Sequence, residues 1–105
     1  MLDSWGNFEA SLGSDGIVSV SWNTFAEEEI SHFDLWRARQ DNQGNYIEVT
    51  RLVRKAAQSD SVAGANYVYQ DHEMVSGQTF YYALAGVDFV GVSHFYDQVI
   101  SVTIP

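Results

Sequence analysis

The stretch Val18-Ser19-Val20-Ser21-Trp22 alternates apolar side chains with serines at every second position. This period of two is typical of a strand that turns one face to a core and the other to water. Turn-forming stretches, among them Gly13-Ser14-Asp15-Gly16 and Asp41-Asn42-Gln43-Gly44-Asn45, separate the alternating runs of the chain. There are seven such runs, at residues 8–12, 18–22, 32–35, 47–50, 67–70, 80–84 and 100–104. Seven short strands at this spacing predict an all-β fold, an antiparallel sandwich of two sheets.

The length and composition of the chain fit one compact domain. Its 105 residues, 46% of them hydrophobic, are enough for one core and too few for two ordinary domains. We therefore assign residues 1–105 to a single domain with its core between about residues 8 and 104. The strand-like end Val102-Thr103-Ile104-Pro105 favours a domain cut from a longer chain. No stretch has the roughly 18 apolar residues that a membrane-spanning helix needs.

Charge is unevenly distributed along the sequence. Fourteen acidic residues against five basic ones give a net charge of −9, which argues against nucleic acid and anionic membranes as partners. All five basic residues lie within residues 37–55, and with two acidic residues they give this segment a net charge of +3. We therefore expect a locally basic zone on an acidic body, with Arg51, Arg54 and Lys55 as a candidate interaction surface.

The parity of the runs predicts which side chains form the core, because every second side chain of a strand points to the same face. The large side chains expected to be buried are Val20, Trp22, Phe33, Leu35, Tyr69, Phe80, Tyr82 and Val102. Residues 55–66 are small and polar and predict a loop or a weak edge strand. Residues 25–30 are too few for a stable helix and favour a loop or a single turn. Trp5 is expected to precede the first strand.

Several stretches together resemble fibronectin type III domains of a bacterial branch. Val18-Ser19-Val20-Ser21-Trp22 resembles the second strand with its buried tryptophan, and His32-Phe33-Asp34-Leu35-Trp36-Arg37 resembles the third. The last half of the domain is matched by Tyr67-Val68-Tyr69-Gln70-Asp71, Val75-Ser76-Gly77-Gln78-Thr79-Phe80-Tyr81-Tyr82 and Gly86-Val87-Asp88-Phe89-Val90-Gly91. The resemblance covers the chain from about Phe8 to Ile104, and it depends on the order and spacing of these motifs.

The resemblance implies a seven-stranded, immunoglobulin-like Greek-key sandwich. Domains of this kind are commonly non-catalytic modules of long extracellular or cell-surface bacterial proteins. The corner tyrosine of the family falls on Phe80, which has no hydroxyl, so Tyr82 is the candidate to supply the corner hydrogen bond. The Arg-Gly-Asp motif that binds integrins is absent, so the resemblance implies no role of that kind.

The sequence contains no catalytic signature, and we predict neither an enzyme nor a cofactor. There is no cysteine, no Gly-x-Ser-x-Gly motif and no His-Glu-x-x-His motif. Two acidic clusters offer oxygen ligands to a cation, Asp71-His72-Glu73 and Glu27-Glu28-Glu29. Both lack the spacing of known metal sites, so we interpret the first as a solvated turn and the second as a solvated loop. Whether Glu27-Glu28-Glu29 binds a cation stays open.

Two aromatic residues are expected outside the core. If Phe33 and Leu35 point inward, Trp36 points outward, and Tyr81 likewise points away from its neighbours in sequence. The implied topology makes the third and sixth strands neighbours, so Trp36 and Tyr81 are expected on one exposed face. Exposed planar rings suit stacking on sugars, peptides or a neighbouring domain. The alternative is that cross-strand pairing, or cover by a long side chain such as Arg51 or Arg54, is their only role.

These observations favour a non-catalytic structural or interaction module, a spacer or docking domain of a larger bacterial protein. The expected partners are neighbouring domains of the same chain or another protein. The alternative function is a carbohydrate-binding accessory domain that binds polysaccharide with Trp36 and Tyr81. The expected location is extracellular or at the cell surface, although the sequence is also compatible with the cytoplasm.

Overall fold

The computed structural model describes residues 5–25, 29–58 and 64–105, and these residues form strands and loops without a helix. No segment of this part of the chain is therefore a helix able to cross a membrane. The strands are β1 (Trp5–Leu12), β2 (Val18–Thr24), β3 (Ile30–Gln40), β4 (Tyr46–Ala56), β5 (Asn66–Asp71), β6 (Thr79–Asp88), β7 (Ser93–Phe95) and β8 (Ile100–Thr103). Six of the seven predicted runs lie within one of these strands, and the seventh, residues 100–104, extends one residue beyond β8.

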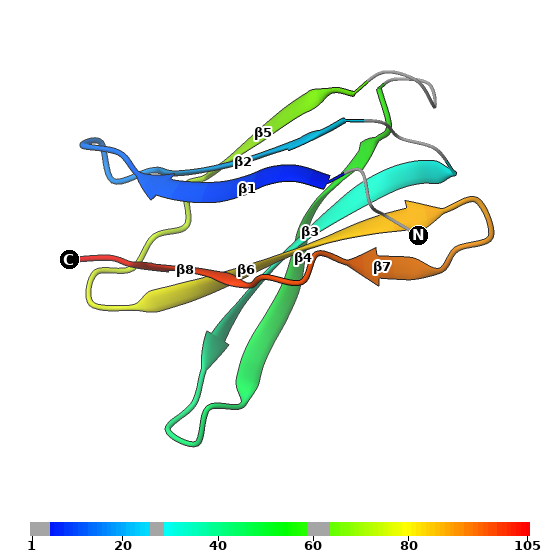
Figure 1. Cartoon of the computed structure of the whole chain (residues 1–105). Helices are drawn as coiled ribbons and strands as arrows, with labels where there is room; N and C mark the ends of the chain where they lie inside the picture. The colour runs from blue at the N-terminus through cyan, green and yellow to red at the C-terminus, as the bar shows by residue number, and fades with distance from the viewer. Residues whose placement is uncertain (1–4, 26–28, 59–63) are drawn as a thin grey trace.

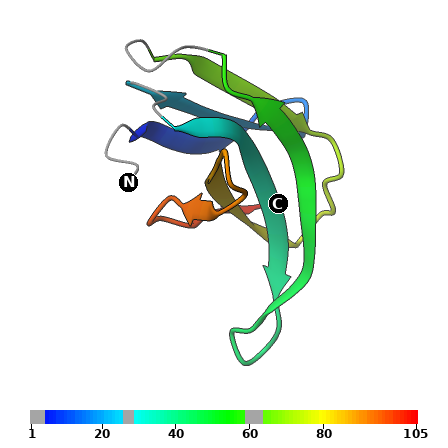
Figure 2. The same ribbon diagram turned by 90° about the vertical axis from the view of Figure 1, so that its right-hand side faces the viewer.

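The strands form two antiparallel sheets that pack face to face, as Figure 1 shows. The first sheet has the order β1-β2-β5, and the second has the order β4-β3-β6-β7, with β8 also paired to β6. The third and sixth strands are therefore neighbours, as expected. The predicted antiparallel sandwich is confirmed. The hairpin of β3 and β4 extends well beyond the first sheet and curves away from it (Figures 1 and 2).

The number of strands differs from the prediction, because the described residues contain eight. Ser93–Phe95 forms β7 and pairs with Ala85–Val87 of β6, whereas β8 pairs with Thr79–Tyr82 of the same strand. The two short strands thus share one edge of β6 and together replace a single long strand. Three residues are too few to show a period of two, which is why the sequence pattern missed β7.

The core lies between the two sheets and is rich in aromatic rings. Trp22 of β2 stacks on Tyr67 of β5, with ring centroids 5.4 Å apart and planes 10° apart, and Phe33 of β3 lies 5.0 Å from Tyr67. Six of the predicted core residues are buried, namely Val20, Trp22, Phe33, Leu35, Phe80 and Tyr82. Tyr69 and Val102 are only half-buried and pack against the margin of the core.

Two predicted boundaries are wrong. Trp5 does not precede the first strand but begins it, because it pairs with Thr24 of β2. The loop expected to start at Lys55 starts later, because β4 continues through Ala56, which pairs with His32. Residues 59–63 of that predicted loop, and Glu27 and Glu28 of the acidic cluster, lie outside the described residues.

A buried polar cluster joins the two sheets where β5 ends. The Tyr82 hydroxyl donates to Asp71 Oδ2 over 2.8 Å, and Arg37 Nη1 donates to both Asp71 oxygens over 2.8 Å. Arg37 Nη2 also donates to Glu73 over 3.0 Å, and its guanidinium lies 5.1 Å from the centre of the Phe80 ring. Burial first, and then the Asp71 carboxylate, raise the pKa of Tyr82 far above its usual range.

This cluster corrects the interpretation of Asp71-His72-Glu73 as a solvated turn. His72 and Glu73 are exposed, but Asp71 is only 1% exposed and is paired inside the molecule. Tyr82 supplies the hydroxyl that Phe80 lacks, and it joins β6 of the second sheet to β5 of the first. The sequence could not show this pairing, because the partners lie 11 and 34 residues apart.

Candidate functional site

The second sheet carries an open apolar groove on the face that points away from the core, which we call the outer groove. It has a volume of about 280 Å³. Its lining residues come from β3, β4, β6, β7 and the segment before β8. They are Trp36, Arg37, Ala38, Tyr46, Val49, Tyr81, Ala83, Phe95 and Val99.

Strand alternation explains how the centre of the outer groove forms. Phe33 and Leu35 point into the core, so Trp36 and Ala38 of β3 face outward. Trp36 lies opposite Ala83 of β6, and Ala38 lies opposite Tyr81. Two large rings therefore sit diagonally across two alanines, and the alanines form the low floor between them.

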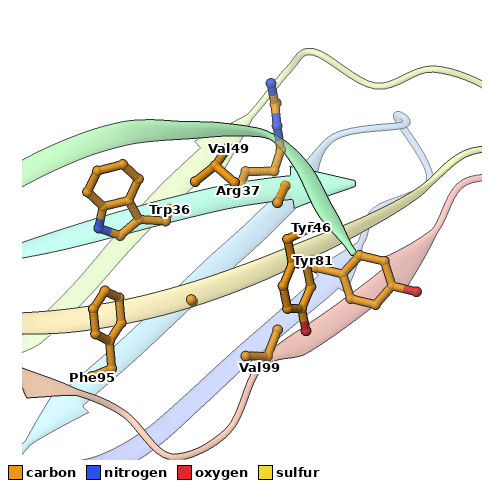
Figure 3. A pocket seen from close by; sticks show the side chains of 9 residues that line it. Trp36, Arg37, Tyr46, Val49, Tyr81, Phe95 and Val99 are labelled. Atoms are coloured by element: carbon orange, nitrogen blue, oxygen red, sulfur yellow. The ribbon is translucent and has the colours of Figure 1, made fainter. Parts of the chain in front are cut away.

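Aromatic side chains form the two ends of the outer groove. Figure 3 shows Trp36 and Phe95 together at one end and Tyr46 and Tyr81 together at the other, with Val99 at one side. The rings of Tyr46 and Tyr81 meet edge to face, with centroids 5.7 Å apart and planes at 71°. Phe95 is 57% exposed and Tyr46 is 50% exposed, so much of this aromatic surface is open to solvent.

The structure thus brings Trp36 and Tyr81, the two predicted ligand-binding residues, into one groove. Both are half-buried rather than fully exposed. Their binding role stays a prediction. The sequence pattern did not indicate the residues that complete the walls, namely Tyr46, Val49, Phe95 and Val99.

A bulge in β4 explains why Val49 was missed. The pattern placed Ile47 and Val49 on the same face, but Arg37 pairs with Thr50 and Arg39 pairs with Ile47, so Ala38 faces two residues of β4. The bulge is centred on Glu48, which has a φ of 54°. Beyond the bulge the facing of the strand is reversed, and Val49 joins Tyr46 on the outer face.

The lining of the outer groove suits contact with apolar surfaces rather than proton transfer. None of the lining residues is an acid or a histidine, and Arg37 directs its guanidinium to Asp71 and Glu73. Of the side chains that commonly act as general acids or bases, only the tyrosines Tyr46 and Tyr81 line the groove. Within the described residues, moreover, no three acidic or histidine side chains gather as metal ligands would.

The basic zone predicted from the sequence is largely paired inside the molecule. Arg54 donates two hydrogen bonds to Asp34, over 2.8 and 3.1 Å, and Arg39 donates two to Glu48, over 3.0 and 2.6 Å. Burial alone would raise the pKa of Asp34, but the Arg54 guanidinium more than offsets this effect and holds the pKa below its usual range. Of the three residues singled out, Arg54 is therefore already engaged.

The other two residues of the predicted interaction surface differ in exposure. Lys55 is half-buried and lies opposite Phe33. Arg51 is exposed and lies opposite Trp36, at the border of the outer groove. The structure thus separates Lys55 from the groove and places Arg51 beside it.

Comparisons with known proteins support the fold and no more specific identity. No protein family model matches the sequence, and no curated protein matches it. An Fn3-like protein from Clostridium thermocellum is 18% identical, with a TM-score of 0.61 over 97% of this chain and 92% of that one. A pectate lyase from Erwinia chrysanthemi, solved in complex with tetragalacturonic acid, is 13% identical, with a TM-score of 0.64. That match covers 91% of this chain but only 27% of the lyase. The fold is fibronectin type III-like.

Proposed function

We propose that this domain is a non-catalytic interaction module of a larger secreted or cell-surface bacterial protein, and that it binds its partner through the outer groove. The observation that carries the proposal is the pair of aromatic ends around a floor of alanines. Aromatic side chains contribute most of the binding energy in many protein interfaces, because they bury a large area at a small cost in conformational entropy. The likeness to a part of the longer pectate lyase chain also supports a module within a larger protein.

Peptides selected for binding to the folded domain test this proposal. A library of random peptides displayed on phage should yield ligands that bind at the outer groove, because such selections favour open apolar surfaces. Replacing Trp36 with alanine should lower the affinity for these peptides by about tenfold or more, as expected for a central interface residue. Isothermal titration of each peptide with each variant gives the affinities.

Val68→Ala is the matched control for this experiment. Val68 is 54% exposed on β5, in the first sheet, and so it presents an apolar side chain away from the outer groove. Its removal should leave every selected peptide bound as before. Peptides that tolerate Trp36→Ala, or that lose binding with Val68→Ala, would show that the groove is not the binding face.

A second candidate function is the binding of polysaccharide by the same groove. Trp36 and Tyr81 are aromatic residues of the groove, and sugars commonly stack on aromatic rings. The exposed Arg51 opposite Trp36 suits a sugar carboxylate. One structural neighbour was solved with tetragalacturonic acid, an acidic oligosaccharide. The apolar lining favours a protein partner, because sugars also need polar groups to fix their hydroxyls.

Affinity electrophoresis separates the two candidates. Gels that contain neutral or acidic polysaccharides should not retard the domain if its partner is a protein. Retardation in an acidic polysaccharide, lost in both Trp36→Ala and Tyr81→Ala, would instead support the carbohydrate-binding function. A melting temperature close to that of the unsubstituted domain would show that the loss is not due to unfolding.

A further inference from the structure

The turn between β6 and β7 exposes apolar side chains at a position where turns are usually polar. Phe89 is 74% exposed, Val90 is 84% exposed and Val92 is 50% exposed. Phe89 and Val90 occupy the tip of the turn, and we call these two residues the apolar tip. Figure 1 shows that this turn projects from one end of the sandwich.

The apolar tip is held in place by Asp88. Its Oδ1 accepts hydrogen bonds from the amides of Val90 and Val92 over 3.0 and 2.9 Å, and its Oδ2 lies 3.1 Å from His94 Nε2. The amide of Gly91, at a φ of 91°, bonds back to the Asp88 carbonyl. A turn whose backbone is fixed in this way has less backbone freedom to lose when it binds, which favours binding.

The outer groove has the properties that complement the apolar tip. Its floor is formed by alanines and its ends by rings, so an inserted phenylalanine would meet aliphatic surface beneath it and aromatic surface at both ends. Its volume of about 280 Å³ is at the low end for ligand pockets and suits one or two side chains. The tip of a chain does not reach its own groove. The paired ends of β6 and β7 extend beyond the groove, and the tip lies at the far end of this hairpin.

The charges around the two surfaces are also complementary. At the tip end, the exposed Glu29 precedes Ile30, which pairs with Asp88. At the groove, the exposed residue opposite Trp36 is Arg51. Opposite charges at the borders of two apolar patches favour their association in one orientation.

From these observations we infer that the partner in the outer groove is a second copy of this domain, which inserts its apolar tip. This inference rests on the proposed function and names the occupant. The contact is head to tail, since each copy offers a tip at one place and a groove at another. Repetition of a head-to-tail contact gives an open chain of copies, or a ring where the rotation between copies closes. The contact area is small, so the association is expected to be weak and visible only at high protein concentration.

Sedimentation equilibrium with two variants tests this arrangement. The tip variant carries Phe89→Ser and Val90→Ser, and the groove variant carries Trp36→Ala and Tyr81→Ala. The unsubstituted domain should show an average mass that rises with concentration beyond that of a dimer. Each variant alone should stay monomeric. An equimolar mixture should form a one-to-one heterodimer and stop there, because it contains one intact tip and one intact groove for each pair.

Several results would overturn the inference. These are a monomeric unsubstituted domain at the highest soluble concentration, association that persists in either variant alone, and a mixture that fails to form heterodimers. Val68→Ser is the control and should associate like the unsubstituted domain. If the groove variant does not fold, Val99→Arg serves in its place, because Val99 is 48% exposed at the side of the groove.

The same samples separate this inference from the proposed function. The tip variant keeps the outer groove, so peptides selected for the groove should still bind to it. Peptide binding without self-association would overturn the second copy as the partner and leave the interaction module standing. If the domain neither binds peptides nor self-associates, both the proposed function and this inference are overturned.

Discussion

Asp71 shows how a single carboxylate ties the two sheets of this domain together. It stands at the end of β5 in the first sheet, and its partners Arg37 and Tyr82 both belong to the second. A buried charge is tolerated only where it is paired and hydrogen-bonded, which Asp71 achieves with three hydrogen bonds to these two residues. The cluster therefore fixes how the sheets lie against each other.

Substitutions in this cluster should differ in cost. Tyr82→Phe removes one hydrogen bond and leaves Asp71 paired with Arg37, so we expect a loss of about 1–2 kcal/mol in the free energy of unfolding. Asp71→Ala leaves the largely buried Arg37 with Glu73 alone, so we expect a loss of roughly 3 kcal/mol. Urea unfolding of both variants measures the difference. Equal costs would contradict the role assigned to Asp71.

Trp22 and Trp36 offer a second comparison between single residues. Trp22 is 2% exposed between Tyr67 and Phe33, so Trp22→Ala should lower the free energy of unfolding by about 3–5 kcal/mol. Trp36 lies on the outer face, and Trp36→Ala should cost roughly 1 kcal/mol or less. Urea unfolding monitored by circular dichroism is suitable for both variants. A large loss for Trp36→Ala would identify that ring as part of the core rather than of a binding face.

At the scale of elements, β4 is an edge strand with two features that hinder its pairing with another chain. It pairs only with β3 among the described strands, so its other side is open to additional pairing. Two register shifts break its ladder, and charged residues including Glu48, Arg51 and Arg54 are exposed along it. Bulges and charges on an edge hinder pairing with another chain. This is one reason to place the contact between copies at the groove and tip rather than along β4.

The hairpin of β6 and β7 carries a prediction at the same scale. Asp88→Ala removes the acceptor for the amides of Val90 and Val92, so the turn should open more often. Amide hydrogen exchange measured by NMR should become faster at these two positions. The amides of the β2–β5 ladder should exchange as before, and they serve as the internal reference. Unchanged exchange at Val90 and Val92 would show that Asp88 does not hold the tip.

At the scale of the whole molecule, stability is expected to fall in acid. The pKa values of Asp34, Asp41, Glu48 and Asp88 are held below their usual range, and backbone amides or basic side chains supply the lowering in each case. A carboxyl group with a lowered pKa in the folded state stabilises the protein above its unfolded pKa of about 4, and this stabilisation is lost as the pH falls through the folded value.

Asp34→Asn isolates one of these groups. At pH 7 the variant should be less stable, because Asp34 is buried beside Arg54 and asparagine carries no charge. The difference from the unsubstituted domain should shrink as the pH falls below about 4, the unfolded pKa of an aspartate, and through the lower folded pKa of Asp34. Asp34 is then protonated and as neutral as asparagine. Urea unfolding at a series of pH values follows this difference. A difference that is constant with pH would contradict the assignment.

The sequence was sufficient for much of the fold but for less of the candidate site. Alternation over regular strands such as β2 and β6 correctly predicted Val20, Trp22, Phe80 and Tyr82 as core. It also placed Trp36 on the outer face, where the structure has it. The prediction that Val49 shares a face with Ile47 was wrong. A bulge shifts the side-chain alternation of the strand by one residue, and no local sequence pattern marks the bulge.

The amino-acid sequence by itself determined the class of the fold and which side chains of the regular strands point into the core. It could do so because the side-chain period of a strand is a local property of the backbone. Only the tertiary structure decided that Asp71 joins two sheets, that rings from four parts of the chain enclose one groove, and that two apolar residues stand at an exposed tip. These features depend on register, bulges and packing between segments distant in sequence. They are set by the free energy of the whole molecule rather than by the preference of any single stretch.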